Sequence, residues 1–285
     1  MKKWRLIIDV EKCENCSNCF LSCRDEHVDN EWPGYASAQA GQGPGWIEVL
    51  RKERGQYPLI DVAYLPLTCM QCRDAPCMQA ALGGAVRRRP DGIVIIDPER
   101  SRGQRQIVSA CPYNAVRWNE ATGTPQKCTL CAHLLDEGWE QTRCVQSCPT
   151  GALSLRKSED GEMEEAAGSD GLAVYRPELG TKPSVYYRNL HRFTRCFIAG
   201  SVAVQTEGKE ECAEGAEIVL TNARGETTGR EAADAFGDFK LDNLEEHSGP
   251  YRLTISYKGY KAKTLEASVT KSVSLGTILL EKDRS

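Results

Sequence analysis

The sequence has no long apolar segment. Its 285 residues contain no hydrophobic run approaching the ~20 residues that a membrane-spanning helix needs. The N-terminal stretch MKKWRLIIDV is too short in apolar residues for a signal peptide and carries no twin arginine. We therefore expect a soluble chain of about two domains. The default location is the cytoplasm, unless a partner with an export signal carries the chain elsewhere.

The sequence also lacks the common catalytic motifs. It has no nucleophile elbow, no glycine-rich loop that cradles phosphate, and no paired carboxylates in a cleft context. The formal net charge is only −4, which gives no reason to expect nucleic acid or a membrane surface as a partner. The sequence therefore predicts no catalytic residues on this chain.

Cysteine, in contrast, is abundant, with 14 residues. The run CENCSNCFLSC at positions 13–23 has the spacing C-x2-C-x2-C-x3-C, as in bacterial two-cluster ferredoxins. Three thiolates on one tight loop can each reach a different iron of a cubane, and the fourth points away toward a second cluster. A zinc knuckle is the alternative, but it usually shows C-x2-C in pairs. The spacing predicts a 4Fe–4S cluster.

Three further segments complete the cysteine pattern. CMQCRDAPC supplies Cys69, Cys72 and Cys77, and CTLC with CVQSC supplies Cys128, Cys131, Cys144 and Cys148. Between them, ERSRGQRQIVSACP contains Cys111 alone, followed by proline as in a ferredoxin loop. The other positions of that loop are occupied by Ser101, Gln104 and Ile107, and the fourth position of the second loop is Ala81. The segment with Cys111 therefore resembles a ferredoxin loop that has lost three ligands. In chain order it is the third cysteine loop, and the loop with Cys128, Cys131, Cys144 and Cys148 is the fourth.

In the ferredoxin arrangement, the last cysteine of each run ligates the cluster of the other run. Applied here, this rule gives three clusters, each with four ligands. They are cluster 1 with Cys13, Cys16, Cys19 and Cys148, cluster 2 with Cys23, Cys128, Cys131 and Cys144, and cluster 3 with Cys69, Cys72, Cys77 and Cys111. The missing cysteines at Ala81, Ser101, Gln104 and Ile107 are the four ligands of a single vacated fourth cluster. We therefore predict three clusters rather than four.

Three residues lie outside this scheme. Cys196 and Cys212 are predicted to be buried thiols, since a reducing compartment disfavours a disulfide between them. Lys127 precedes Cys128 and either tunes a cluster by its charge or is simply solvated. The rarity of buried lysine favours a solvated side chain.

The chain changes character after the last cysteine loop. Residues 157–171 are acidic and rich in small residues, which is typical of a flexible linker. The aromatic run at 177–193 is either an interface patch or a covering segment over the cluster domain. From residue 196, short alternating strands with glycine and asparagine turns predict a β-sandwich. Its Phe236-Gly237-Asp238-Phe239 and Lys258-Gly259-Tyr260 stretches resemble the prealbumin-like or carboxypeptidase-regulatory family.

These observations predict an α+β chain. Residues 1–155 form a polycluster domain of two ferredoxin-like halves, with an insertion at 24–68. Residues 156–195 are a linker and a covering or interface segment, and residues 196–285 are the sandwich domain.

A wider resemblance follows from these segments. Residues 1 to about 155 resemble the polyferredoxin electron-transfer subunits of the dimethyl-sulfoxide-reductase family of molybdenum enzymes. NEWPGY at 30–35, ERGQYP at 53–58, CAHLLD at 131–136 and ELGTKPSVYYRNLHRF at 178–193 narrow the resemblance. With the C-terminal sandwich and the vacated cluster, they are similar to the iron–sulfur (small) subunits of pyrogallol–phloroglucinol transhydroxylases.

The resemblance implies a large partner subunit that carries Mo-bis-molybdopterin guanine dinucleotide and the active site, in a heterodimer or a higher assembly. This chain would then be a non-catalytic electron-transfer subunit in anaerobic polyphenol metabolism, where hydroxyl groups are transferred between aromatic rings or removed from them. One alternative is the same role in a reductive catechol dehydroxylase or in another oxidoreductase of the family. A free-standing ferredoxin-like carrier and a binding protein with structural clusters are alternatives of other classes.

Overall fold

The structure, a computed structural model, describes residues 1–283, and the chain divides into two compact units. The first unit comprises Met1–Arg51 and Tyr64–Leu190, and the second comprises Lys52–Ala63 and the chain from His191 onward. This division differs from the predicted boundaries at two places. Residues 156–190 belong to the first unit, and part of the 24–68 insertion belongs to the second. No helix within residues 1–283 is long and apolar enough to cross a membrane.

A three-stranded sheet forms one part of the first unit. Its central strand β1 (Lys3–Asp9) pairs antiparallel with β8 (Leu153–Ser158) and parallel with β9 (Val185–Arg188). The apolar run at positions 6–8 is buried, as its branched side chains predict. The aromatic run at 177–193 thus contributes strand β9 to this sheet. The same run begins with the short 3-10 helix η1 (Pro177–Leu179).

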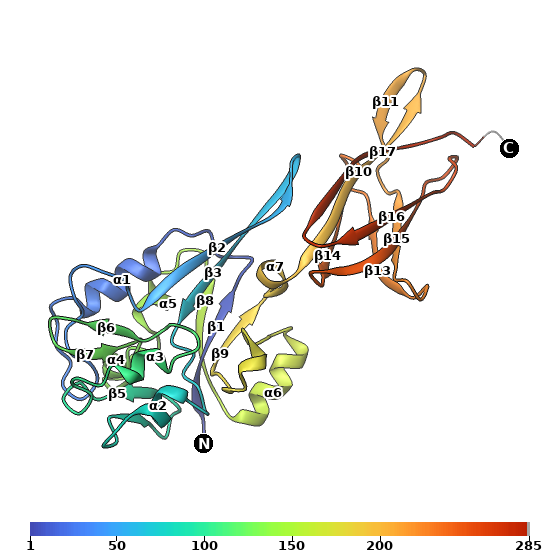
Figure 1. The fold of residues 1–285 in the computed structure, drawn as a ribbon. Coiled ribbons are helices and arrows are strands. Elements are labelled where there is room, and N and C mark those ends of the chain that lie inside the picture. The colour runs from blue at the N-terminus through green and yellow to red at the C-terminus, as the bar shows by residue number, and fades with distance from the viewer. Residues whose placement is uncertain (284–285) are drawn as a thin grey trace. The chain divides into compact units, whose positions relative to one another are not determined.

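The acidic stretch 157–171 is a helix rather than a flexible linker. Helix α6 (Asp160–Ser169) begins with a capping box formed by Glu159 and Glu162, which satisfies two otherwise unpaired backbone N–H groups. The helix lies beside β9 (Figure 1), and its Met163 packs in a small core with Ile7. The acidic residues that suggested disorder are therefore the N-terminal cap and solvent face of a docked helix.

The remainder of the first unit consists of short helices and hairpins that hold the cysteine loops. The helices are α1 (Asn18–His27), α2 (Pro76–Ala80), α3 (Gln106–Ser109), α4 (Ala132–Asp136) and α5 (Arg143–Gln146). The hairpins are β2 (Ile47–Gln56) with β3 (Leu59–Thr68), β4 (Val86–Arg88) with β5 (Val94–Ile96), and β6 (Arg117–Asn119) with β7 (Thr124–Gln126). In the β4–β5 hairpin, Gly92 adopts a positive φ of 88°, which glycine reaches without steric cost.

The second unit is a β-sandwich of two four-stranded sheets that share one apolar core. In the first sheet, the long strand β10 (Cys196–Thr206) pairs in parallel with β17 (Val273–Leu280) on one side. On its other side, β14 (Asp238–Leu244) pairs with residues 196–201 and β11 (Lys209–Cys212) with residues 203–206. The second sheet has the order β13 (Thr227–Ala232), β12 (Glu217–Thr221), β15 (Ser248–Ser256) and β16 (Lys263–Val269). Side chains at alternate positions of both sheets fill the core, among them Ile198, Leu241, Ile218, Leu253 and Ile255.

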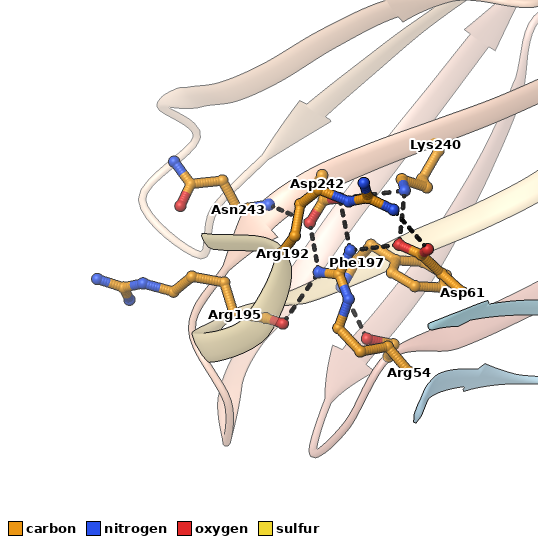
Figure 2. A network of polar contacts seen from close by, with 9 residues as sticks. Arg54, Asp61, Arg192, Arg195, Phe197, Lys240, Asp242 and Asn243 are labelled. Carbon is orange, nitrogen blue, oxygen red and sulfur yellow. Dashed lines mark hydrogen bonds and ion pairs between the residues drawn. The ribbon is translucent and has the colours of Figure 1, made fainter. Parts of the chain in front are cut away.

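The tip of the β2–β3 hairpin is part of this second unit and is held there by a buried ion network (Figure 2). The Arg54 guanidinium donates to Asp61 at 2.5 Å and to Asp242 of β14 at 2.9 Å, and it lies over the Phe197 ring at 5.2 Å. A Cβ atom at Gly55, whose φ is 91°, would come within 2.8 Å of Phe197. Glycine at this position therefore allows the hairpin tip to contact β10 directly.

Candidate iron–sulfur centres

The first cysteine loop leaves β1 and turns sharply before α1. Asn15 and Ser17 both adopt positive φ, of 55° and 62°, which bends the loop between the cysteines. Burial raises the pKa of the Cys19 thiol to about 11, and the neighbouring sulfurs of Cys13, Cys16 and Cys148 add to this increase. The fold thus brings together the four cysteines predicted for cluster 1, one of them from the end of the fourth loop.

The second group combines Cys23 of α1 with three cysteines of the fourth loop. Burial raises the pKa of Cys23 well above its usual range, and the sulfurs of Cys128, Cys131 and Cys144 contribute next. The backbone N–H of Leu130 donates to Cys128 Sγ at 3.3 Å, because Leu130 itself adopts a positive φ of 54°. The four cysteines predicted for cluster 2 therefore also lie together.

The third group lines a cavity of the first unit. Cys69, Cys72, Cys77 and Cys111 share this cavity with Met70, Val94, Tyr113, Val116 and other mainly apolar residues. Burial raises the pKa of Cys72 to about 12, followed by the effect of Cys69. The backbone N–H of Ala115 donates to Cys111 Sγ at 3.4 Å.

The three groups follow one another in space. The pKa values of Cys23 and Cys144 in the second group are raised mainly by burial and by cysteines of their own group. Cys19 of the first group adds a smaller increase to both. Cys69 of the third group raises the pKa of Cys128 in the second, where burial is the largest cause. The second group is therefore next to each of the other two.

The chemistry of these donor sets fits iron–sulfur clusters. Burial and the mutual influence of the sulfurs raise most of the thiol pKa values, so a cationic centre must stabilise the thiolate form. Within residues 1–283, no three His, Cys, Asp or Glu side chains converge closely enough to ligate a single metal ion. A cubane has a different requirement, because each of its four irons takes one thiolate.

The prediction that Lys127 is solvated is wrong. Its side chain is 2 % exposed, and its ammonium donates to the carbonyl oxygens of Val94 and, at 3.2 Å, of Cys128. Lys127 also lines the cavity of the third cysteine group. Its charge opposes the rise in the pKa of Cys77 that burial and Cys69 cause. Lys127 is thus placed to act electrostatically on that centre.

Hydrogen-bonded or apolar side chains occupy the four positions of the vacated fourth cluster, Ala81, Ser101, Gln104 and Ile107. The Gln104 amide accepts from the Leu82 N–H at 2.8 Å and donates to the carbonyl oxygens of Leu82 at 3.3 Å and Arg100 at 2.7 Å. Ser101 and Ile107 are fully buried, and Ala81 is the C-cap of α2. Gln104 thereby links the end of α2 to the loop that lacks ligands.

A group of histidine and aromatic side chains near the second cysteine group was missed from the sequence. His27 is the last residue of α1, is 1 % exposed and lies 4.4 Å from the Trp46 ring, and burial lowers its pKa to about 3. His133 stacks on Trp32 at 4.0 Å, and its Nε2 is 2.9 Å from Glu26 Oε1. Because Glu26 and His27 follow Cys23 by three and four positions on one helix, their spacing was a usable signal.

The two remaining cysteines differ from each other. Cys196 is buried at the start of β10, as predicted. Cys212 is exposed at the end of the short strand β11, so its predicted burial is wrong. Both are free thiols.

Comparisons with known proteins agree with the two units. Residues 60–158 match the family "4Fe-4S dicluster domain", and residues 198–278 match "Carboxypeptidase regulatory-like domain". The pilin GBS52 of Streptococcus agalactiae overlaps 47 % of this chain and 60 % of its own, at 14 % identity and a TM-score of 0.28, which is too low to support an argument.

Among curated proteins, the pyrogallol hydroxytransferase small subunit of Pelobacter acidigallici is 42 % identical over 98 % of this chain and 100 % of its own length. The arsenate respiratory reductase iron–sulfur subunit of Shewanella sp. is 25 % identical over 64 % of this chain and 94 % of its own. The chain therefore belongs to the family of iron–sulfur subunits that includes the pyrogallol hydroxytransferase small subunit.

Proposed function

We propose that this chain is the electron-transfer subunit of a molybdenum enzyme that transfers or removes hydroxyl groups on polyhydroxylated benzene rings. The observation that carries the proposal is the similarity to a pyrogallol hydroxytransferase small subunit over the full length of both chains. The iron–sulfur subunit of arsenate respiratory reductase, in contrast, matches only 64 % of the chain. Hydroxyl transfer from pyrogallol is accordingly the first reaction to test.

Three 4Fe–4S clusters are proposed for the three cysteine groups described above, with the ligand sets predicted from the spacing. Two ferredoxin-like halves are proposed as their scaffold. The helix pairs support this, because α1 contacts α5 and α2 contacts α3. The α1–α5 pair joins the two loops that exchange Cys23 and Cys148 under the crossed rule, and the α2–α3 pair joins the loop of Cys69, Cys72 and Cys77 to the loop that supplies Cys111.

When bound, such clusters supply one-electron transfer. The residues of this chain determine the conditions under which it occurs. The thiols hold the groups in sequence, with the second group adjacent to the first and to the third. Backbone N–H groups of Leu130 and Ala115 donate to ligand sulfurs and favour their charged form. Burial of the third group keeps water away from it.

The first group is the one most open to solvent. Cys16 is exposed and Cys13 is half-buried, whereas Cys69, Cys72 and Cys77 of the third group are buried.

We place the active site and Mo-bis-molybdopterin guanine dinucleotide on a large partner subunit, in at least a heterodimer. The cytoplasm is the proposed location, since free thiols such as Cys196 and Cys212 persist in a reducing compartment.

The experiment that tests the function is a direct assay of the complex purified under anaerobic conditions. In one reaction the complex receives pyrogallol with 1,2,3,5-tetrahydroxybenzene, and in the other a catechol with a reduced viologen. Transfer of a hydroxyl group between two phenols is redox-neutral overall, so we expect phloroglucinol without any reductant. Reductive loss of a hydroxyl group needs two electrons delivered through this subunit and would appear as viologen oxidation.

The two outcomes distinguish a transhydroxylase from a reductive dehydroxylase. Turnover of neither aromatic substrate, together with turnover of formate, nitrate or sulfur or arsenic oxyanions, would contradict the aromatic substrate and leave the electron-transfer role intact. A subunit that is stable and redox-active without any partner would instead be a free-standing carrier.

A further inference from the structure

The first unit contains a second cavity, of about 350 Å³, that the cluster chemistry does not use. Its walls come from β1, the Cys69–Cys77 loop, β4, α6 and the segment between η1 and β9. Positive side chains dominate this lining. They are Lys3, Arg5, Arg73, Arg88, Arg176 and Lys182.

The negative side chains around the cavity do not balance these six. Asp160 and Glu164 are the two carboxylates of the lining. Asp160 accepts from Lys3 at 2.5 Å, from Arg73 at 2.5 Å and from Arg5, and the Lys3 and Arg5 contacts lower its pKa to about 2. Lys182 and Arg176 each pair with one carboxylate outside the cavity, Asp74 and Glu178. With all four carboxylates counted against the six cations, two positive charges remain uncompensated.

Two guanidinium groups of this lining have unused donors. The Arg5 side chain is 5 % exposed, and its Nε has no hydrogen-bond partner. The buried Nε of Arg88 also has none, and its Nη2 donates to the carbonyl oxygen of Cys72 at 3.2 Å. Both Nε atoms are themselves shielded from solvent, so the two side chains offer a ligand in the cavity their positive charge rather than a free Nε donor. The planar fork of a guanidinium matches the oxygens of a phosphate.

We propose that this cavity binds a phosphate-type dianion, either free phosphate or a phosphate group on a small organic molecule. A dianion matches the two uncompensated charges, and arginine donors are suited to its oxygens. The volume is in the range of small-molecule sites and is larger than one phosphate needs. It leaves room for an organic part beside Val174 and Tyr186 of the lining.

The site and the third cysteine group lie on the same loop, of which Gln71 and Arg73 line the site and Cys69, Met70 and Cys72 line the cysteine cavity. The N–H of Arg73 donates to the Lys182 carbonyl oxygen at 2.9 Å, and the N–H of Ser184 donates to the Met70 carbonyl oxygen at 2.9 Å. A bound anion beside this loop disfavours added negative charge there. Phosphate should therefore lower the midpoint potential of that centre more than the potentials of the other two. This consequence rests on the proposed function, whereas phosphate binding itself does not.

The test is isothermal titration calorimetry on the anaerobically purified complex, with inorganic phosphate, glycerol 3-phosphate and, as the neutral control, glycerol. We expect one saturable site per chain for the two phosphate compounds and none for glycerol. Tighter binding of glycerol 3-phosphate would show that the organic part is held, and equal binding would identify free phosphate as sufficient.

Two variants locate the site. Arg88→Met should weaken phosphate binding at least tenfold, while its neighbour on β4, Arg87→Met, should not, because Arg87 is exposed and outside the cavity. Asp160→Asn should tighten binding, since it removes the internal carboxylate that competes for three of the cations. Absence of saturable binding, or binding that neither Arg88→Met nor Asp160→Asn changes, would overturn the proposal. Because calorimetry needs no turnover, failure here is distinct from failure of the hydroxyl-transfer assay.

Discussion

Replacement of the buried lysine beside the third cysteine group gives a quantitative prediction. In Lys127→Met, a neutral side chain of similar volume takes the place of an ammonium that is 2 % exposed and lines the cysteine cavity. A positive charge stabilises a reduced cluster more than an oxidised one, because reduction adds an electron. The variant should therefore lower the midpoint potential of the centre held by Cys69, Cys72, Cys77 and Cys111.

The size of the effect follows from Coulomb's law. Loss of one charge at roughly 8 Å, with an effective dielectric constant of ~20, corresponds to about 2 kcal/mol. For a one-electron couple this is a decrease of roughly 90 mV. The variant also leaves the carbonyl oxygens of Val94 and Cys128 without this donor, at a cost of about 1–3 kcal/mol in folding stability.

The assay is an anaerobic redox titration followed by electron paramagnetic resonance. The matched control is Lys12→Met, because Lys12 also directly precedes a cluster cysteine but is exposed, so water screens its charge. Iron content should be checked in both variants, so that a lost cluster is not taken for a shifted one. A shift in Lys127→Met no larger than that in Lys12→Met, or a shift to higher potential, would refute the electrostatic role.

Three further variants test other parts of the structure. Cys111→Ala should lose or convert one paramagnetic signal of the reduced protein and keep two; loss of a centre bound by the first or fourth loop would show that the pairing scheme is wrong. Arg54→Met should destabilise the second unit by about 3 kcal/mol in denaturant unfolding, because half-buried Asp61 and Asp242 lose their main partner. An unchanged unfolding midpoint would contradict the stabilising role of the network in Figure 2. Gln104→Ala should cost about 2 kcal/mol and speed proteolysis between residues 81 and 104, since three hydrogen bonds to backbone atoms are lost. Wild-type resistance would mean that these bonds do not hold the loop.

Much of this structure follows from local sequence signals. Alternating apolar and polar residues with glycine and asparagine turns predicted a sandwich from residue 196, and the first strand of that sandwich, β10, begins at Cys196. The crossed ferredoxin rule also predicted which cysteines lie together, because a fixed spacing determines which way each thiol of a run points. In each case a short stretch of chain carries the information.

The features that were missed depend on contacts between distant segments. Lys127 is buried because Val94, 33 residues earlier, supplies an acceptor for its ammonium, and no local pattern reports this. The acidic helix α6 is stable because its Met163 packs near Ile7, not because of its composition. The assignment of Lys52–Ala63 to the sandwich unit likewise depends on Arg54 reaching Asp242, 188 residues away.

Metal analysis tests most directly the central claim that this chain holds three 4Fe–4S clusters and lacks the ligands of a fourth. Iron and zinc should be measured per small-subunit chain in the complex purified under anaerobic conditions. Three clusters of four irons predict about 12 iron atoms and no zinc. A value near 16 irons would contradict the account, because Ser101 or another group without a thiol would then ligate a fourth cluster.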